Sequence, residues 1–150
     1  MDNSKISITQ FIGSWELHEW RAESMEGDIV YPFGPDAIGE IVYNDDGHMS
    51  VQIMKPNRAK FVSDDPLEGQ RDEILSAYNG FIAYSGTYEV NEKSNQVFHH
   101  IKISSFPNWV GQKQIRNFEF RDNLLILSTD FIESRKHRLI WHKREQKDFI

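Results

Sequence analysis

The chain has 150 residues, a net charge of −6 and no cysteine. This length is typical of one domain that buries roughly two-thirds of its unfolded surface, so we expect a single domain over residues 1–150. The acidic balance and the scattered basic residues exclude the positive face of a nucleic-acid-binding protein, and the lack of cysteine excludes disulfides and thiolate catalysis.

The sequence also predicts a cellular setting. Its first residues contain no apolar run of signal-peptide length, and no later segment is long enough to span a bilayer. The lack of cysteine fits a reducing compartment. We therefore expect a cytoplasmic protein without a membrane partner, present as a monomer or homodimer.

The amino-terminal region predicts a helical turn followed by a strand. Thr9–Ile12 fits one helical turn, which would plug the lower end of a barrel. Gly13–Ala22 fits a strand that carries Trp15 and Leu17 on one face. The next segment, Tyr31–Gly39, contains two prolines and two glycines and predicts a rigid rim.

A β-hairpin is predicted over residues 39–54. Its strands, 39–44 and 47–54, are joined by Asn44-Asp45-Asp46-Gly47, a composition typical of hairpin turns. Alternation with a period of two places one apolar set on a common face, which we expect to point inward: Ile41, Tyr43, Met49, Val51 and Ile53.

One helix is predicted between this hairpin and the later strands. Asp65, Pro66 and Glu68 fit the N-cap, first and third helical positions, and Asn79-Gly80 fits the end. An apolar face recurs at helical spacing, formed by Leu67, Ile74, Leu75 and Tyr78. We expect this helix to cover a mouth of the barrel or to pack against its wall.

The rest of the chain predicts five short strands bounded by turn residues. They span residues 81–90, 96–104, 113–121, 124–129 and 136–143. Antiparallel strands at such regular spacing are typical of a closed up-and-down barrel. The predicted fold is therefore all-β, a single antiparallel barrel of eight or nine strands with one helix and a short amino-terminal helical turn.

Four segments carry a family resemblance: Gly13–Trp15, the block from Tyr31 to Met54, Phe81–Tyr88 and the Phe-Pro-Asn-Trp-Val-Gly segment at 106–111. In their order and spacing they resemble the bacterial lipocalin-like domain family. The resemblance implies a calycin-type β-barrel around a small-molecule cavity. It names no ligand.

Alternation along the later strands predicts which side chains face the barrel interior. On 81–90 the inward set is Ile82, Tyr84, Gly86, Tyr88 and Val90; on 96–104 it is Val97, His99, Ile101 and Ile103; on 113–121 it is Gln114, Arg116, Phe118 and Phe120. A few polar groups that converge within apolar walls are typical of a ligand cavity.

Arg116 and His99 are the strongest candidates for specific chemistry. A guanidinium at Arg116 would anchor a carboxylate, phosphate or enolate oxygen; the alternatives are a pairing with an internal acid or an outward orientation. His99 would act as an acid or base, or would be a hydrogen-bonded core histidine. Because His99 and His100 are adjacent on a strand, they point to opposite faces, and we expect no metal site.

The tyrosines and Trp109 complete the candidate set. Tyrosines would donate hydrogen bonds to a carbonyl or would be plain core, and Trp109 would close the mouth of the barrel or anchor a rim loop. The predicted ligand-binding residues are Tyr43, Met49, Tyr84, Tyr88, His99, Trp109, Gln114 and Arg116. The catalytic candidates among them, if a reaction occurs, are His99, Arg116 and Tyr84.

Three functions follow from this set. The first is binding of a small, mostly apolar molecule, neutral or anionic, in the cavity. The second is a cyclase or isomerase acting in the same cavity, with Arg116 and tyrosines stabilising an enolate and His99 moving a proton. The third is an interaction module whose barrel is filled by side chains. The sequence contains no glycine-rich phosphate loop and no nucleophile elbow, so we expect no cofactor.

Overall fold

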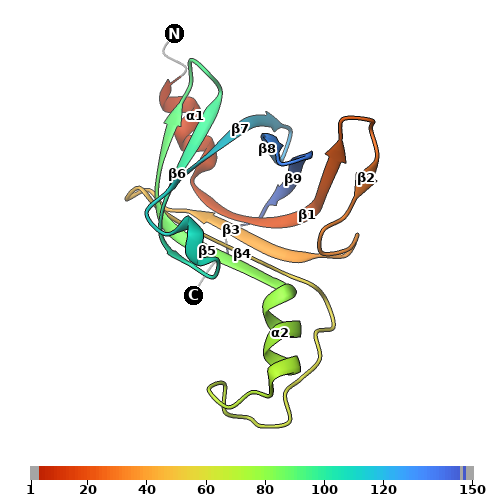
Figure 1. The fold of residues 1–150 in the computed structure, drawn as a ribbon. Helices are drawn as coiled ribbons and strands as arrows, with labels where there is room; N and C mark the ends of the chain where they lie inside the picture. Colours follow the sequence, from red (N-terminus) through yellow and green to blue (C-terminus); the bar gives the residue numbers. More distant parts are fainter. Residues whose placement is uncertain (1–3, 146, 148–150) are drawn as a thin grey trace.

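The computed structural model describes residues 4–145 and 147 and shows a closed antiparallel β-barrel (Figure 1). The sheet order is β2-β1-β3-β4-β5-β6-β7-β8-β9, and β1 also pairs with β9. Eight strands therefore close the barrel, and β2 extends the sheet beside β1. The strands are β1 (Gly13–Ser24), β2 (Ile29–Val30), β3 (Ile38–Tyr43), β4 (His48–Met54), β5 (Phe81–Asn91), β6 (Gln96–Ser104), β7 (Lys113–Arg121), β8 (Leu124–Ile132) and β9 (Arg135–Lys143). The helices are α1 (Ser4–Phe11), α2 (Arg71–Asn79) and the 3₁₀ turn η1 (Pro107–Trp109). The predicted all-β barrel is confirmed.

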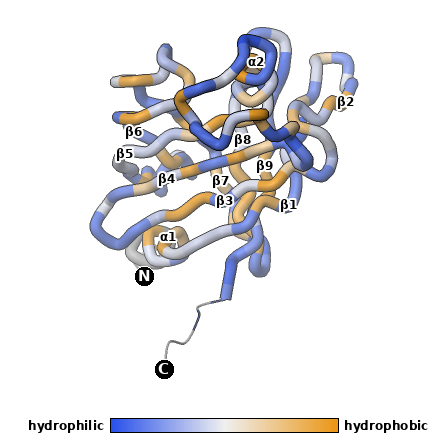
Figure 2. Tube along the Cα trace, turned by 90° about the horizontal axis from the view of Figure 1, so that it is seen from below, coloured by the Kyte–Doolittle hydropathy of each residue, from blue (hydrophilic) through white to orange (hydrophobic). Residues whose placement is uncertain are grey.

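The alternation of apolar and polar residues decides what enters the core. Figure 2 shows hydrophobic and hydrophilic stretches alternating along strands such as β4. All five predicted inward residues of the β3–β4 hairpin are buried, and so are Trp15 and Leu17 on β1. The fully or nearly buried apolar cluster comprises Phe11, Trp15, Leu17, Ile41, Tyr43, Met49, Val51, Ile53, Val97, Leu125, Leu127 and Trp141.

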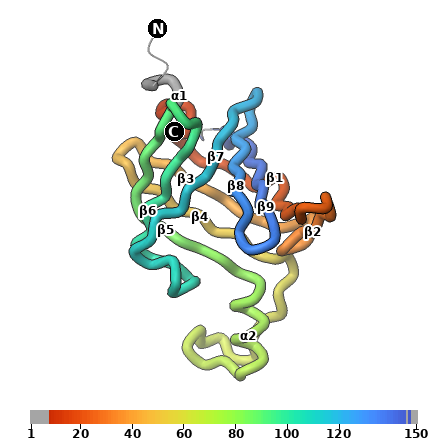
Figure 3. The backbone as a smooth tube through the Cα atoms, turned by 45° about the horizontal axis from the view of Figure 1, so that its top comes forward, coloured from red at the N-terminus to blue at the C-terminus, as the bar shows by residue number. Residues whose placement is uncertain are grey.

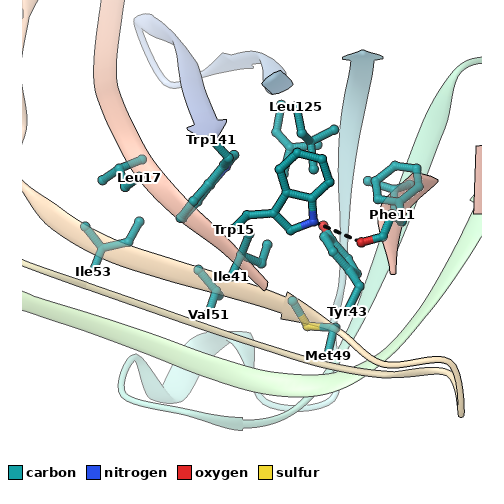
Figure 4. Close-up of a cluster of buried hydrophobic side chains, with 12 residues drawn as sticks. Phe11, Trp15, Leu17, Ile41, Tyr43, Met49, Val51, Ile53, Leu125 and Trp141 are labelled. Carbon is teal, nitrogen blue, oxygen red and sulfur yellow. Dashed lines mark hydrogen bonds between the residues drawn. The ribbon is translucent and has the colours of Figure 1, made fainter. Parts of the chain in front are cut away.

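The helix α1 closes one end of the barrel. Phe11, at its carboxyl end, is fully buried and meets the rings of Tyr43, Phe118 and Phe120 edge-on at centroid distances of 4.9–5.1 Å. The indole N–H of Trp15 donates to the carbonyl oxygen of Phe11 at 2.9 Å (Figure 4). The predicted helical turn is thus a longer helix, and its last residue forms the plug.

Two irregularities change which residues face inward. In the β1–β9 pairing the register shifts between Leu17 and Glu19, and Trp20 and Ala22 then pack inward. In the β5–β6 pairing the register shifts between Ser85 and Gly86. The prediction that Ile103 points inward is wrong, because Ile103 lies beyond this shift and is 71% exposed.

The helix α2 does not cover the barrel. It extends away from it (Figures 1 and 3), and none of its residues is buried. The predicted start at Asp65 is also wrong: the Asp65 side chain accepts from the N–H of Leu67 in a turn, and α2 begins at Arg71. Glu73 fixes this start, since its Oε1 accepts from the N–H of Gln70 at 2.9 Å. Among the described residues, no helix is both long and apolar enough to cross a membrane.

Candidate ligand cavity

An apolar cavity of about 280 Å³ lies inside the barrel. Aliphatic and indole side chains form most of its wall, with a few polar groups among them. The lining residues are Trp20, Ile41, Val51, Ile53, Ile82, Tyr84, His99, Trp109, Arg116, Leu127, Thr129, Ile132, His137, Leu139 and Trp141.

One polar cluster on the wall is a histidine held between two tyrosines. The hydroxyl of Tyr43, on β3, lies 2.7 Å from Nε2 of His99 on β6, and the hydroxyl of Tyr84, on β5, lies 2.6 Å from its Nδ1. His99 is only 1% exposed. Both ring nitrogens of a buried histidine are therefore satisfied by side chains.

Burial keeps this histidine uncharged. Burial, together with the nearby charge of Arg116 and then His100, lowers the pKa of His99 to about 3. Burial raises the pKa of Tyr84, which Arg116 opposes, and raises the pKa of Tyr43 well above its usual value. At neutral pH the cluster is therefore a neutral imidazole between two neutral phenols.

A second polar cluster joins β1, β8 and β9. The indole N–H of Trp20 donates to Nδ1 of His137 at 3.1 Å, and the backbone N–H of His137 donates to Oγ1 of Thr129 at 3.0 Å. Burial, followed by the charges of Arg116 and Arg135, lowers the pKa of His137. His137 is thus also a neutral imidazole with one nitrogen accepting.

Arg116 is the one formally charged side chain in the cavity lining. Its Nη1 donates to the carbonyl oxygen of Ile115 at 3.0 Å and to Oε1 of Gln114 at 3.4 Å. Among the residues that the structure describes, ion pairs join other arginines and histidines to acids, but Arg116 takes part in none of them. The predicted alternative, in which Arg116 pairs with an internal acid, is therefore not seen among these residues.

Trp109 lies in η1, in the loop between β6 and β7, and lines the cavity. Its ring meets Tyr84 edge-on at a centroid distance of 5.7 Å and Phe106 at 5.4 Å. The indole therefore packs against Tyr84, one of the two tyrosines that bond to His99.

Comparison with known proteins identifies the family. The family model of the lipocalin-like domain matches residues 12–144. The chain belongs to this family. The lipocalin-like chain is also 31% identical over 108 residues to the 4'-hydroxy-3'-methoxypropiophenone carrier protein ppsC of Aspergillus oryzae (strain ATCC 42149 / RIB 40), a match that covers 68% of this chain and 92% of that protein. The bacterial part of the resemblance stays a prediction.

Solved structures with similar outlines include designed and natural barrels. One is a redesigned beta barrel, b11L5F_LGL, with a TM-score of 0.46, 10% identity and coverage of 92% of this chain and 95% of that one. Another is the REP1-NXSQ fatty acid transporter, with a TM-score of 0.42, 12% identity and coverage of 93% and 99%. Neither adds to the architecture described above.

The structure places four of the eight predicted ligand-binding residues in the cavity lining: Tyr84, His99, Trp109 and Arg116. The other four lie outside that lining. Tyr43 bonds to His99 from outside the lining, and Met49 belongs to the buried core cluster. Tyr88 donates its hydroxyl proton to the carbonyl oxygen of Asn44, and Gln114 accepts from Arg116. The roles of all eight residues in binding stay predictions.

Sequence reasoning missed part of the lipocalin-like cavity. Thr129, on β8, shares a face with buried Leu125 and Leu127, and His137, on β9, shares a face with Leu139 and Trp141, so alternation would have found both. Trp20 was hidden by the β1 bulge, which moves it to the inner face. No group of three or more metal-ligating side chains occurs among the described residues.

Proposed function

We propose that this lipocalin-like protein binds and carries a small, mostly apolar aromatic molecule in its barrel cavity. The observation that carries the proposal is the cavity itself, which has apolar walls and a few convergent polar groups. Its volume of about 280 Å³ lies just under the range of about 300–1,000 Å³ typical of ligand pockets, so it suits a molecule of one or two rings.

The relative from Aspergillus oryzae supports an aromatic ligand, because its name describes a carrier of a substituted propiophenone. Three indoles line the cavity of this chain, those of Trp20, Trp109 and Trp141, and they offer aromatic faces to such a ring. Arg116 would anchor an oxygen of partial or full negative charge, so the ligand would be neutral or anionic.

The geometry favours a carrier over a cyclase or isomerase. A proton-moving histidine needs a free nitrogen and a pKa near the working pH. Both nitrogens of His99 are occupied by tyrosines, and its pKa lies at about 3. The cavity also favours a carrier over a barrel filled by side chains. Cytoplasmic location and a monomeric or homodimeric state stay predictions.

Binding of 4'-hydroxy-3'-methoxypropiophenone, measured by isothermal titration calorimetry, tests the proposal. We expect the wild-type protein to bind it with one site per chain. Ile82→Trp places a bulky ring in the cavity wall and should abolish binding, whereas the matched Ile38→Trp, at an exposed position of β3, should retain it. Circular dichroism confirms that both variants fold. Equal affinity of the two variants would contradict a ligand in the barrel.

A further inference from the structure

We infer that Tyr84 presents its hydroxyl proton to the cavity, because Tyr43 and His99 fix the direction of their hydrogen bonds, and that the ligand is therefore held through an acceptor-only oxygen. The matching chemical class is a ketone, an aryl ether or a deprotonated phenol or acid. This inference rests on the proposed function and specifies the ligand chemistry of the same site.

Tyr43 sets the direction of the first hydrogen bond. Its side chain is fully buried, and among the described residues its hydroxyl has one hydrogen-bond partner, Nε2 of His99. A buried hydroxyl proton without an acceptor is destabilising, so Tyr43 donates its proton to Nε2. Nε2 therefore carries a lone pair and no proton.

The proton of His99 then lies on the other nitrogen. A neutral imidazole has one donor and one acceptor nitrogen, so Nδ1 carries the proton and donates it to the oxygen of Tyr84. Because Tyr84 accepts from His99, its own O–H is not used in this contact. Tyr84 lines the cavity, so this O–H is available to a ligand. Each donor in the chain Tyr43 to His99 to Tyr84 also strengthens the next.

Nitrogen-bearing side chains of the lining offer further donors. An indole N–H only donates, so Nδ1 of His137 accepts from Trp20, and the proton of neutral His137 lies on Nε2. Arg116 has donors only. The indole N–H of Trp141 has no acceptor among the described residues.

The two hydroxyl oxygens of the lining already accept hydrogen bonds, that of Tyr84 from His99 and that of Thr129 from the backbone N–H of His137. The lining contains no aspartate, glutamate, asparagine or glutamine that would accept a ligand proton. A ligand that offers oxygens as acceptors satisfies several of these donors, whereas an amine or ammonium group would enter a site with one cation and no anion. The cavity therefore selects acceptor oxygens over cationic groups.

A pair of ligands with the same skeleton tests this inference: propiophenone, which has a carbonyl oxygen, and propylbenzene, which lacks it. The measured quantity is the ratio of the dissociation constant of propylbenzene to that of propiophenone, from calorimetry. We expect Tyr84→Phe to lower this ratio about five- to tenfold, the effect of one hydrogen bond. Tyr78→Phe removes a tyrosine hydroxyl on exposed α2 and should leave the ratio unchanged.

The tautomer of His99 gives a second readout that needs no ligand. In ¹⁵N-labelled protein, the ring nitrogen shifts of His99 should show the proton on Nδ1. Tyr43→Phe removes the donor that fixes this state without touching the cavity lining, and should lower the ligand ratio as Tyr84→Phe does.

The outcomes separate the two claims. Binding of both compounds with a ratio that Tyr84→Phe leaves unchanged overturns the inference and leaves the carrier function standing. A wild-type proton on Nε2 of His99 also overturns it. If neither these compounds nor the substituted propiophenone binds, the proposed function is wrong and the inference falls with it.

Discussion

At the scale of single residues, the most unusual feature is a histidine that is kept neutral inside the barrel. Two tyrosines satisfy its ring nitrogens, so no buried polar group of the imidazole is left without a partner. The arrangement stabilises the fold only while His99 stays unprotonated, because protonation would break the bond that Nε2 accepts and would place a charge in an apolar interior.

The first prediction concerns the pH dependence of stability. The pKa of His99 is about 3 in the folded protein and about 6.5 in an unfolded chain, so between these values the unfolded state binds the extra proton. The free energy of unfolding therefore falls as pH falls through this window, by about 1.4 kcal/mol per pH unit from this group. Between about pH 6 and about pH 4.5 the loss from His99 is about 2 kcal/mol.

Urea unfolding of wild type and His99→Gln at both pH values measures this loss. Glutamine still offers a donor and an acceptor to the two tyrosines but cannot titrate. The loss on acidification should be about 2 kcal/mol smaller in His99→Gln than in wild type. His48→Gln, which removes an exposed histidine in the hairpin, is the control. Parallel pH dependence of wild type and His99→Gln would show that His99 is not neutral in the folded state.

At the scale of elements, the β5–β6 pairing depends on a glycine at its register shift. A Cβ built at Gly86 would overlap the backbone carbonyl of His100 on the neighbouring strand. The two backbones approach this closely because the shift between Ser85 and Gly86 brings β5 against β6.

The second prediction is that Gly86→Ala destabilises the protein by about 3 kcal/mol, since the overlap is with backbone that must move. The neighbouring substitution Ser85→Ala adds no atoms and should cost well under about 1 kcal/mol. Chemical denaturation of both variants gives the comparison. A cost for Gly86→Ala no larger than for Ser85→Ala would mean that the strands do not meet there.

Residues 55–80, the excursion between β4 and β5 that contains α2, are held by few contacts. Glu73 joins its parts, because Oε1 accepts from the N–H of Gln70 and Oε2 accepts from the N–H of Val62 at 2.8 Å. Most of the large apolar side chains of this excursion are exposed, Leu67 by 92%. An element with so little buried surface opens locally at low cost.

The third prediction follows: Glu73→Ala accelerates hydrogen exchange at the amides of Gln70 and Val62, and shortens the lifetime of α2, while the barrel amides keep their protection. Asp72→Ala removes an acid from the same helical turn without removing either bond and serves as the control. Global unfolding of the barrel in Glu73→Ala would show that the excursion and the barrel are one cooperative unit.

At the scale of the whole molecule, the barrel divides into a packed end and a hollow one. Phe11, the last residue of α1, packs in the core cluster with Trp15 and Tyr43 (Figure 4), and none of these three residues lines the cavity. A ligand that packs against the apolar lining gives its atoms new contacts, so binding should stabilise the fold.

The fourth prediction is a ligand-dependent rise in the melting temperature. At a concentration about a hundredfold above its dissociation constant, a ligand adds about 2.7 kcal/mol to the free energy of unfolding, which corresponds to about 5–10 °C for a protein of this size. Thermal unfolding with 4'-hydroxy-3'-methoxypropiophenone should show this rise in wild type and not in Ile82→Trp. Equal rises would indicate binding outside the barrel.

The sequence by itself determined the barrel, because alternation with a period of two and regular turn residues are local signals that do not depend on long-range contacts. It also placed Tyr84, His99 and Arg116 inside, since regular strands preserve alternation. It missed Trp20 and misplaced Ile103, because both lie at shifts of register that only pairing with a neighbouring strand creates.

Only the tertiary structure decided the chemistry of the cavity. The bonds of His99 join β3, β5 and β6, and 56 residues separate Tyr43 from His99 along the chain. Nothing in either local sequence shows that a tyrosine from one strand would fix the proton of a histidine on another. Barrel closure brings these groups within hydrogen-bond distance, and burial then removes the water that would otherwise satisfy them, so their protonation is a property of the folded barrel.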